Sequence, residues 1–181
     1  MSEEFDVLKL VATRLALADI PYMVTGSMAL NYYATPRMTR DIDIVVELSP
    51  EGVDRVVQAF RDDFYLDRAM IEEAGKTRGM FNIIHRGFVI KVDFIVRKDS
   101  EYRRVEFGKK RWVTVEDLDL CLVAPEDLIL SKLEWAKDSR SERQLDDVRN
   151  LLASVQDLDK DYLVRWADRL SLGALYREVG G

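Results

Sequence analysis

Apolar and polar positions follow two different periods along this chain, and the change of period divides it into two parts. Up to about residue 124, short runs with the alternating or continuous apolar pattern of strands are interspersed with helical stretches. Strands are predicted at 22–25, 41–48, 79–85, 88–96, 112–115 and 119–123. Helices are predicted in the first twenty residues, from Met28 to near Pro36, and from Ser49 to about Phe60.

After Ala124 the pattern is helical throughout. Pro125 opens one predicted helix that runs to about Lys137. Residues 141–144 have the spacing of a capping box for a second helix, and residues 163–170 mark a third helix. The sequence therefore predicts an α+β core at residues 1–124, followed by a helical segment, residues 125–181, packed on that core.

Composition narrows the class of protein. The 181 residues include no apolar run near the ~20 that a membrane span needs, and the acidic N-terminus has no apolar signal core. Cys121 is the only cysteine, so no internal disulfide can form. We expect a cytoplasmic protein with no membrane association.

The charge is unevenly distributed. A net charge of −6 argues weakly against broad nonspecific binding to nucleic acid. Residues 97–111, however, carry seven basic side chains against three acidic ones. This basic stretch is either a surface for an anionic substrate or a solvated hairpin edge, where lysines also block aggregation.

Two carboxylates stand at the head of a predicted strand. Asp41 and Asp43 are two residues apart, so in a strand they share one face, where their charges repel. A divalent metal would offset that repulsion. The alternative is a pair of solvated aspartates at the start of a strand.

A third carboxylate interrupts a later strand. Asp93 lies in the otherwise apolar run 89–96, where a buried carboxylate needs a partner. The partner is either Lys91, which shares its face, or a metal shared with the other two aspartates. Three carboxylates with phosphate oxygens and water can fill two octahedral Mg²⁺ sites.

Gly26 and Ser27 lie between a predicted strand and a predicted helix. Glycine allows close approach of a ligand to the backbone, and a helix N-terminus offers free N–H groups to a phosphate. The Ser27 hydroxyl adds a further donor. By itself the pair is also compatible with an ordinary strand-to-helix turn.

Together these motifs resemble those of the DNA polymerase β nucleotidyltransferase superfamily. The run from Gly26 to Leu30, followed by residues 37–43, is similar to that of AbiEii-like and related stand-alone bacterial or archaeal nucleotidyltransferases. Residues 125–133 and 141–147 are similar to the helical lysine and aspartate motifs of the same proteins. The resemblance covers roughly residues 20–152. It implies a polymerase β-like core, with a mixed twisted sheet flanked by helices and a C-terminal helical extension.

The resemblance also implies a role for each matching residue. Asp41, Asp43 and Asp93 would bind metal and act in catalysis together with Lys132, with Asp93 helping to deprotonate the acceptor hydroxyl. The nucleotide would be bound by Gly26, Ser27, Arg37, Arg40, Lys132 and Asp147. Adjacent Asp146 is the alternative to Asp147. Met28-Ala29-Leu30 departs from the small antitoxin-type enzymes, which usually carry an arginine there, and this favours a toxin-like or orphan subgroup.

The implied reaction transfers a nucleoside monophosphate from an NTP to an acceptor hydroxyl and releases pyrophosphate, using two Mg²⁺ ions, with Mn²⁺ as a substitute. The acceptor is either tRNA or another RNA in a toxin-like role with a cognate antitoxin protein, or a small molecule such as an aminoglycoside. The alternative function is a noncatalytic module that binds a nucleotide or a partner on the same fold.

Overall fold

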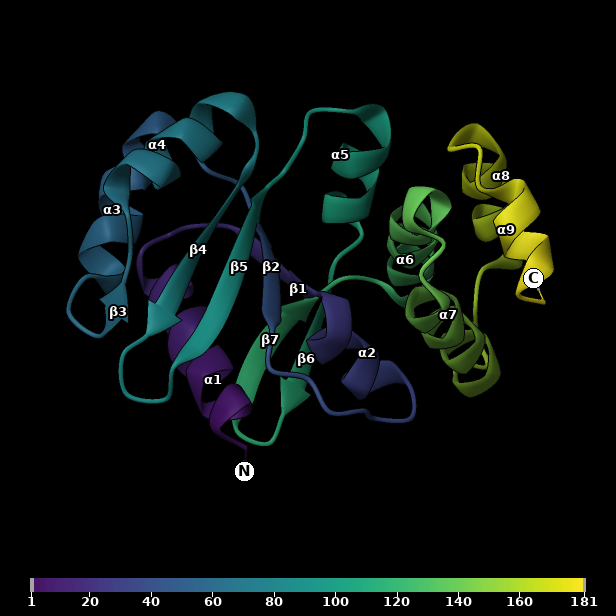
Figure 1. The fold of residues 1–181 in the computed structure, drawn as a ribbon, viewed down its shortest axis with the longest axis horizontal. Helices are drawn as coiled ribbons and strands as arrows, with labels where there is room; N and C mark the ends of the chain where they lie inside the picture. Colours follow the sequence, from purple (N-terminus) through teal and green to yellow (C-terminus); the bar gives the residue numbers. More distant parts are fainter. Residues whose placement is uncertain (1, 181) are drawn as a thin grey trace.

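The computed structural model describes residues 2–180, which form one seven-stranded mixed sheet with helices on both faces (Figure 1). The strands are β1 (Tyr22–Thr25), β2 (Ile42–Val46), β3 (Phe64–Tyr65), β4 (Met80–His85), β5 (Ile90–Val96), β6 (Arg111–Val115) and β7 (Leu118–Leu122). Their order in the sheet is β3-β4-β5-β2-β1-β7-β6. Strand β2 runs parallel to β5 and β1 parallel to β7, while the other neighbours are antiparallel. The predicted mixed sheet flanked by helices is confirmed.

Two apolar clusters cover the two faces of this sheet. The helices are α1 (Glu3–Leu17), α2 (Gly26–Tyr33), α3 (Pro50–Phe60), α4 (Arg68–Thr77), α5 (Glu101–Gly108), α6 (Pro125–Ser139), α7 (Glu142–Ser154), α8 (Lys160–Arg169) and α9 (Gly173–Glu178). Helices α1, α3 and α4 pack on the face that holds Ile42, Ile44 and Val46. On the other face, Met23 and Val123 join the cluster formed by α2 and helices α5 to α9.

The alternation of side chains in β2 places the acidic position on the second face. Because Ile42 and Ile44 are fully buried against α1 and α3, Asp43 between them projects toward α2 and α6. Figure 1 shows α6 to α9 gathered at the end of the molecule opposite α3 and α4. The carboxylate-bearing face of the sheet therefore looks toward the C-terminal helices.

Several elements differ from the prediction. The basic stretch 97–111 contains helix α5 and is not a hairpin edge, because Ser100 caps a helix whose Tyr102 and Phe107 are buried. Strand β3 and helix α4 were not predicted. Helix α7 begins at the predicted place, but the Ser141 side chain accepts no capping hydrogen bond.

The position of Asp41 is a second difference. Strand β2 begins at Ile42, so Asp41 lies in the segment just before the strand, with its side chain 64% exposed.

Within the described residues, no helix has both the length and the apolar character needed to cross a bilayer.

Candidate active site

Two carboxylates lie side by side on neighbouring parallel strands. Asp43 of β2 and Asp93 of β5 are register partners, so their side chains leave the same face of the sheet. Thr25 pairs with Asp43 across β1, and Asn82 pairs with Asp93 across β4. Both aspartates line a cleft between the sheet and α6.

The Asp43 carboxyl is in an environment that disfavours its charge. Burial raises its pKa above the ordinary value, and the negative charges of Asp93 and Asp41 raise it further. A cation bound between these carboxylates would reverse both effects. The electrostatics of this face therefore favour a positively charged ligand.

Lys91 supplies a positive charge from within the protein. Its Nζ lies 2.7 Å from Asp93 Oδ2 and 3.9 Å from Asp41 Oδ1. The hydrogen bond to Asp93 raises the pKa of Lys91, with smaller contributions from Asp41 and Asp43. The Lys91–Asp93 ion pair, which the sequence left open as an alternative, is thus formed, and it sits among all three aspartates.

The carboxylates of this face can supply only part of the coordination shell of a divalent metal. Among residues 2–180, no group of three or more Asp, Glu, His or Cys side chains is close enough to form a complete metal cage. Mg²⁺ usually takes only one or two protein carboxylates and completes its shell with water and substrate phosphates. The neighbouring carboxylates of Asp43 and Asp93 suit that mode of binding, and Asp41 does not join them in a group of three.

Strand β1 leads directly into α2 at a glycine. Gly26 has φ +61°, and a Cβ at this position would overlap the Asp43 carboxylate, so glycine is needed both for the turn and for the close approach. The N-cap residue, Thr25, makes no side-chain capping hydrogen bond. The first N–H groups of α2 therefore remain open to an anion beside the carboxylates.

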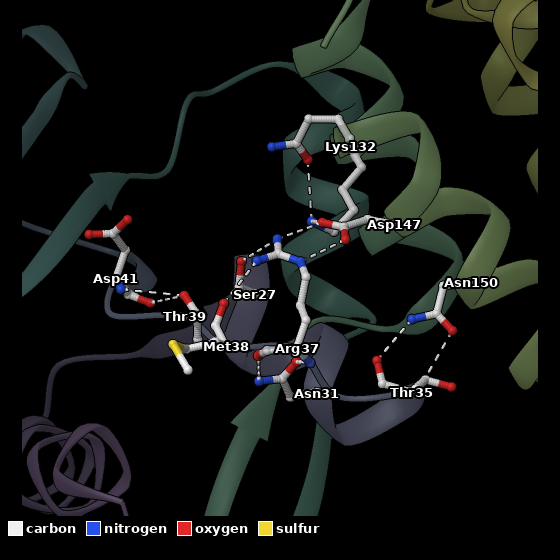
Figure 2. Close-up of polar contacts among 11 residues, drawn as sticks. Ser27, Asn31, Thr35, Arg37, Met38, Thr39, Asp41, Lys132, Asp147 and Asn150 are labelled. Carbon is white, nitrogen blue, oxygen red and sulfur yellow. Dashed lines mark hydrogen bonds and ion pairs between the residues drawn. The ribbon is translucent and has the colours of Figure 1, made fainter. Parts of the chain in front are cut away.

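A network of side chains joins this turn to the C-terminal helices (Figure 2). Arg37 Nη2 donates to Ser27 Oγ at 2.8 Å, and Arg37 also donates two hydrogen bonds to the Asp147 carboxylate, at 2.8 and 2.7 Å. Lys132 Nζ donates to the same carboxylate at 2.7 Å and to Gln144 Oε1 at 3.3 Å. Helix α6 thus holds the cation Lys132, and helix α7 holds the anion Asp147.

The network leaves an excess of positive charge beside Ser27. Burial would raise the pKa of Asp147, but its hydrogen bonds from Arg37 and Lys132 outweigh burial and hold the pKa below the ordinary value. Burial lowers the pKa of Lys132, against the opposing hydrogen bond to Asp147. Two cations therefore share one firmly ionised carboxylate, an arrangement suited to a multiply charged phosphate ligand.

The structure separates the other predicted residues. Asp147 is buried in the network, whereas Asp146 is exposed and pairs with Arg149. Arg40 is exposed and makes no hydrogen bond or ion pair among the described residues. Asp41 lies apart from the Arg37 network in Figure 2, where its backbone contacts Thr39.

Sequence reasoning missed three supporting residues. The Asn31 amide donates to the Arg37 carbonyl and accepts from the Arg37 N–H, both at 2.9 Å, and so fixes the loop that carries Arg37. Its spacing of four from Ser27, one helical turn, was the available signal. Gln144 accepts a hydrogen bond from Lys132. Trp135 lines the cleft one helical turn after Lys132 on α6.

Comparison with known proteins shows the fold. No protein-family model matches the sequence, and the search of curated proteins gives no match. Among solved structures, an antigenic nucleotidyltransferase-like protein from Paracoccidioides brasiliensis is similar at 18% identity and a TM-score of 0.57, over 97% of this chain and 93% of that chain. A Thermotoga maritima protein named as a nucleotidyltransferase is similar at 21% identity and a TM-score of 0.55. The match covers 78% of this chain and 89% of that chain. The lincosamide adenylyltransferase LnuA is similar at 13% identity and a TM-score of 0.54. The match covers 86% of this chain and 99% of that chain. The chain has the fold of the polymerase β-like nucleotidyltransferases.

Proposed function

We propose that this protein transfers a nucleoside monophosphate from an NTP to an acceptor hydroxyl. The observation that carries the proposal is the register of Asp43 and Asp93, which puts two carboxylates on one face beside the open N-terminus of α2. The fold supports it, because the solved neighbours are named as a nucleotidyltransferase, a nucleotidyltransferase-like protein and an adenylyltransferase. The AbiEii-like subgroup is part of the proposal and rests on the sequence motifs alone.

Each residue has a role in this reaction. Asp43 and Asp93, with Asp41, would hold Mg²⁺, which supplies charge neutralisation for the triphosphate and the departing pyrophosphate. Ser27 and the N–H groups of α2 orient the phosphates. Lys132 and Arg37 stabilise the negative charge that develops as pyrophosphate leaves. The acceptor oxygen forms its bond to the α-phosphorus, the bond from that phosphorus to the bridging oxygen breaks, and Asp93 takes up the acceptor proton.

The test is transfer of label from NTPs carrying ³²P at the α-phosphate, incubated with Mg²⁺ and separate fractions of total RNA, protein and small molecules. We predict labelled product and pyrophosphate with the wild type. Asp93→Asn should reduce turnover to background, because it removes both a metal ligand and the proton acceptor, while the melting temperature stays close to that of the wild type.

The control is Asp146→Asn, which changes an exposed acid outside the site. It should keep wild-type turnover. An Asp93→Asn variant that stays fully active would show that Asp93 has no such role. Nucleotide binding without pyrophosphate release, across all acceptor fractions, would instead support the noncatalytic module.

The choice of acceptor is informed by the basic stretch. Its arginines are engaged within the protein: Arg97 pairs with Glu47, Arg103 with Glu106 and Arg104 with Asp99. With its four arginines in ion pairs, the stretch offers an RNA backbone mainly the charges of its three lysines. This favours a small cationic acceptor, drawn by the net charge of −6, over tRNA.

A toxin-like role with an antitoxin partner is the second candidate, and it rests on the departure at residues 28–30 from the antitoxin-type motif. Growth arrest on expression, relieved by a neighbouring gene product and accompanied by label in the RNA fraction, would establish it. Label confined to the small-molecule fraction would establish the first candidate.

A further inference from the structure

One wall of the cleft carries, beside Lys132, apolar side chains that take no part in the network described above. Helix α6 presents Leu128, Ser131, Lys132 and Trp135 to the cleft, a spacing of three, four and seven that forms a single stripe. Across from this stripe the sheet contributes Met80 and Ile95, which are register partners on β4 and β5. The stripe thus runs from the phosphate-directed Lys132 to an indole ring one turn further on.

Among residues 2–180, the Trp135 ring has no stacking partner. Its side chain is 64% exposed although it lines the cleft, and no aromatic ring or cation of the described residues stacks on it. The other two tryptophans are engaged: Trp112 meets Tyr22 edge to face, and Trp166 is buried beside Tyr102 and under Arg169. Of the described residues that line the cleft, Trp135 is the only aromatic one.

We propose that Trp135, with Met80 on the opposite wall of the cleft, is the stacking platform for the nucleobase of the NTP. The inference rests on the proposed function, which puts the triphosphate between Ser27 and Lys132. A nucleoside attached to that triphosphate must leave the carboxylates along the cleft, and Trp135 is the flat apolar surface one helical turn from Lys132. Every base has a ring face to stack, so the platform selects a nucleoside triphosphate over a bare polyphosphate without selecting one base strongly.

The experiment compares two probes that each carry a chain of three phosphorus groups and differ mainly in the presence of a nucleoside. α,β-Methylene-ATP, which cannot undergo transfer at the α-phosphate, and inorganic tripolyphosphate are titrated in Mg²⁺ by calorimetry. Trp135→Ala should weaken binding of the nucleotide by about tenfold, within the range of a lost base–aromatic stack, and change tripolyphosphate affinity by less than about twofold. Trp135→Phe should recover most of the nucleotide affinity.

The matched control is Trp112→Ala, which removes a tryptophan of nearly equal exposure, 65%, outside the cleft. It should leave both affinities unchanged. As a spectroscopic check, the nucleotide should quench tryptophan fluorescence in Trp112→Phe, and Trp135→Phe should lose that quenching. Thermal unfolding of each variant verifies that the fold is retained.

The outcomes separate this inference from the proposed function. Unchanged nucleotide affinity in Trp135→Ala, or equal weakening of both probes, would overturn the platform while leaving the transferase proposal standing. A third outcome is that nucleotide affinity persists in Trp135→Ala while only small-molecule acceptors quench Trp135 fluorescence. That result would assign Trp135 to the acceptor and overturn the base subsite. A wild type that binds neither probe would overturn both proposals.

Discussion

At the scale of single residues, Lys91 is the side chain that most affects how a cation enters the site. Its ammonium lies against Asp93 and near Asp41, so a divalent ion must displace it to reach both carboxylates. We predict that Lys91→Ala binds Mn²⁺ about fivefold more tightly than the wild type, since a partly exposed ion pair is worth up to about 1 kcal/mol. The measurement is the free Mn²⁺ signal in electron paramagnetic resonance.

Lys76→Ala is the matched control, because Lys76 is an exposed lysine on α4. It should bind Mn²⁺ as the wild type does. Weaker Mn²⁺ binding in Lys91→Ala would mean that Lys91 helps to assemble the site instead of competing for it.

Residue types and spacing were enough to predict some of the site. Asp43 and Asp93 follow from strand periodicity, and Gly26 and Ser27 follow from their place between a strand and a helix. Asn31 could not be predicted, because its role is to bond the backbone of a loop whose path depends on the tertiary structure.

At the scale of elements, a buried acid joins α5, α6 and α8. Asp127 Oδ1 accepts hydrogen bonds from Tyr162 at 2.6 Å and Tyr102 at 3.2 Å, while its Oδ2 has no partner in the structure. The pKa of Asp127 is raised to about 6: burial is the main cause and nearby Glu106 adds to it, while the tyrosine hydrogen bonds and Lys109 oppose it. Folding therefore stabilises the protonated form of Asp127 relative to the unfolded chain.

This acid predicts a dependence of stability on pH. The folded chain holds the Asp127 proton more tightly than the unfolded chain between about pH 4 and 6, so the free energy of unfolding falls as pH rises through that window. At about 1.4 kcal/mol per pKa unit the loss is about 3 kcal/mol. Asp127→Asn, neutral throughout, should remove that part of the slope in urea unfolding measured from pH 4 to 7.

Asp157→Asn, which changes an exposed acid, serves as the control and should keep the wild-type slope. If Asp127→Asn also kept the wild-type pH slope, the prediction would be wrong, because the folded and unfolded chains would then hold the Asp127 proton equally well.

Elements with a strong apolar period were predicted, and those that depend on tertiary contacts were not. Helix α6 carries buried residues along most of its length, so its period is plain in the sequence. Helix α5 has only eight residues, half of them charged, and its Tyr102 is buried by packing near Trp166 of α8. Strand β3 has two residues, too few for any period to be read.

At the scale of the whole molecule, Asp147 ties the first part of the chain to the C-terminal helices. It is buried with Lys132 and accepts both hydrogen bonds of Arg37. Asp147→Asn would leave a buried lysine beside an arginine without a compensating charge. We predict that it lowers the free energy of unfolding by about 3 kcal/mol and weakens tripolyphosphate binding, as measured by urea unfolding and calorimetry.

The adjacent Asp146→Asn is the matched control, since Asp146 is exposed and pairs only on its own helix. It should change stability by less than about 0.5 kcal/mol. Equal effects of the two substitutions would show that the shared carboxylate is not what holds Arg37 and Lys132.

The pairing of Arg37 with Asp147 also limits when this network can form during synthesis. The two residues are 110 positions apart, and Ser27 receives its hydrogen bond from the same guanidinium. A ribosome must therefore release α7 before Arg37 and Lys132 can share the Asp147 carboxylate. Until then the growing polypeptide carries Asp43 and Asp93 of its sheet without the ion pairs that tie Ser27 to the C-terminal helices.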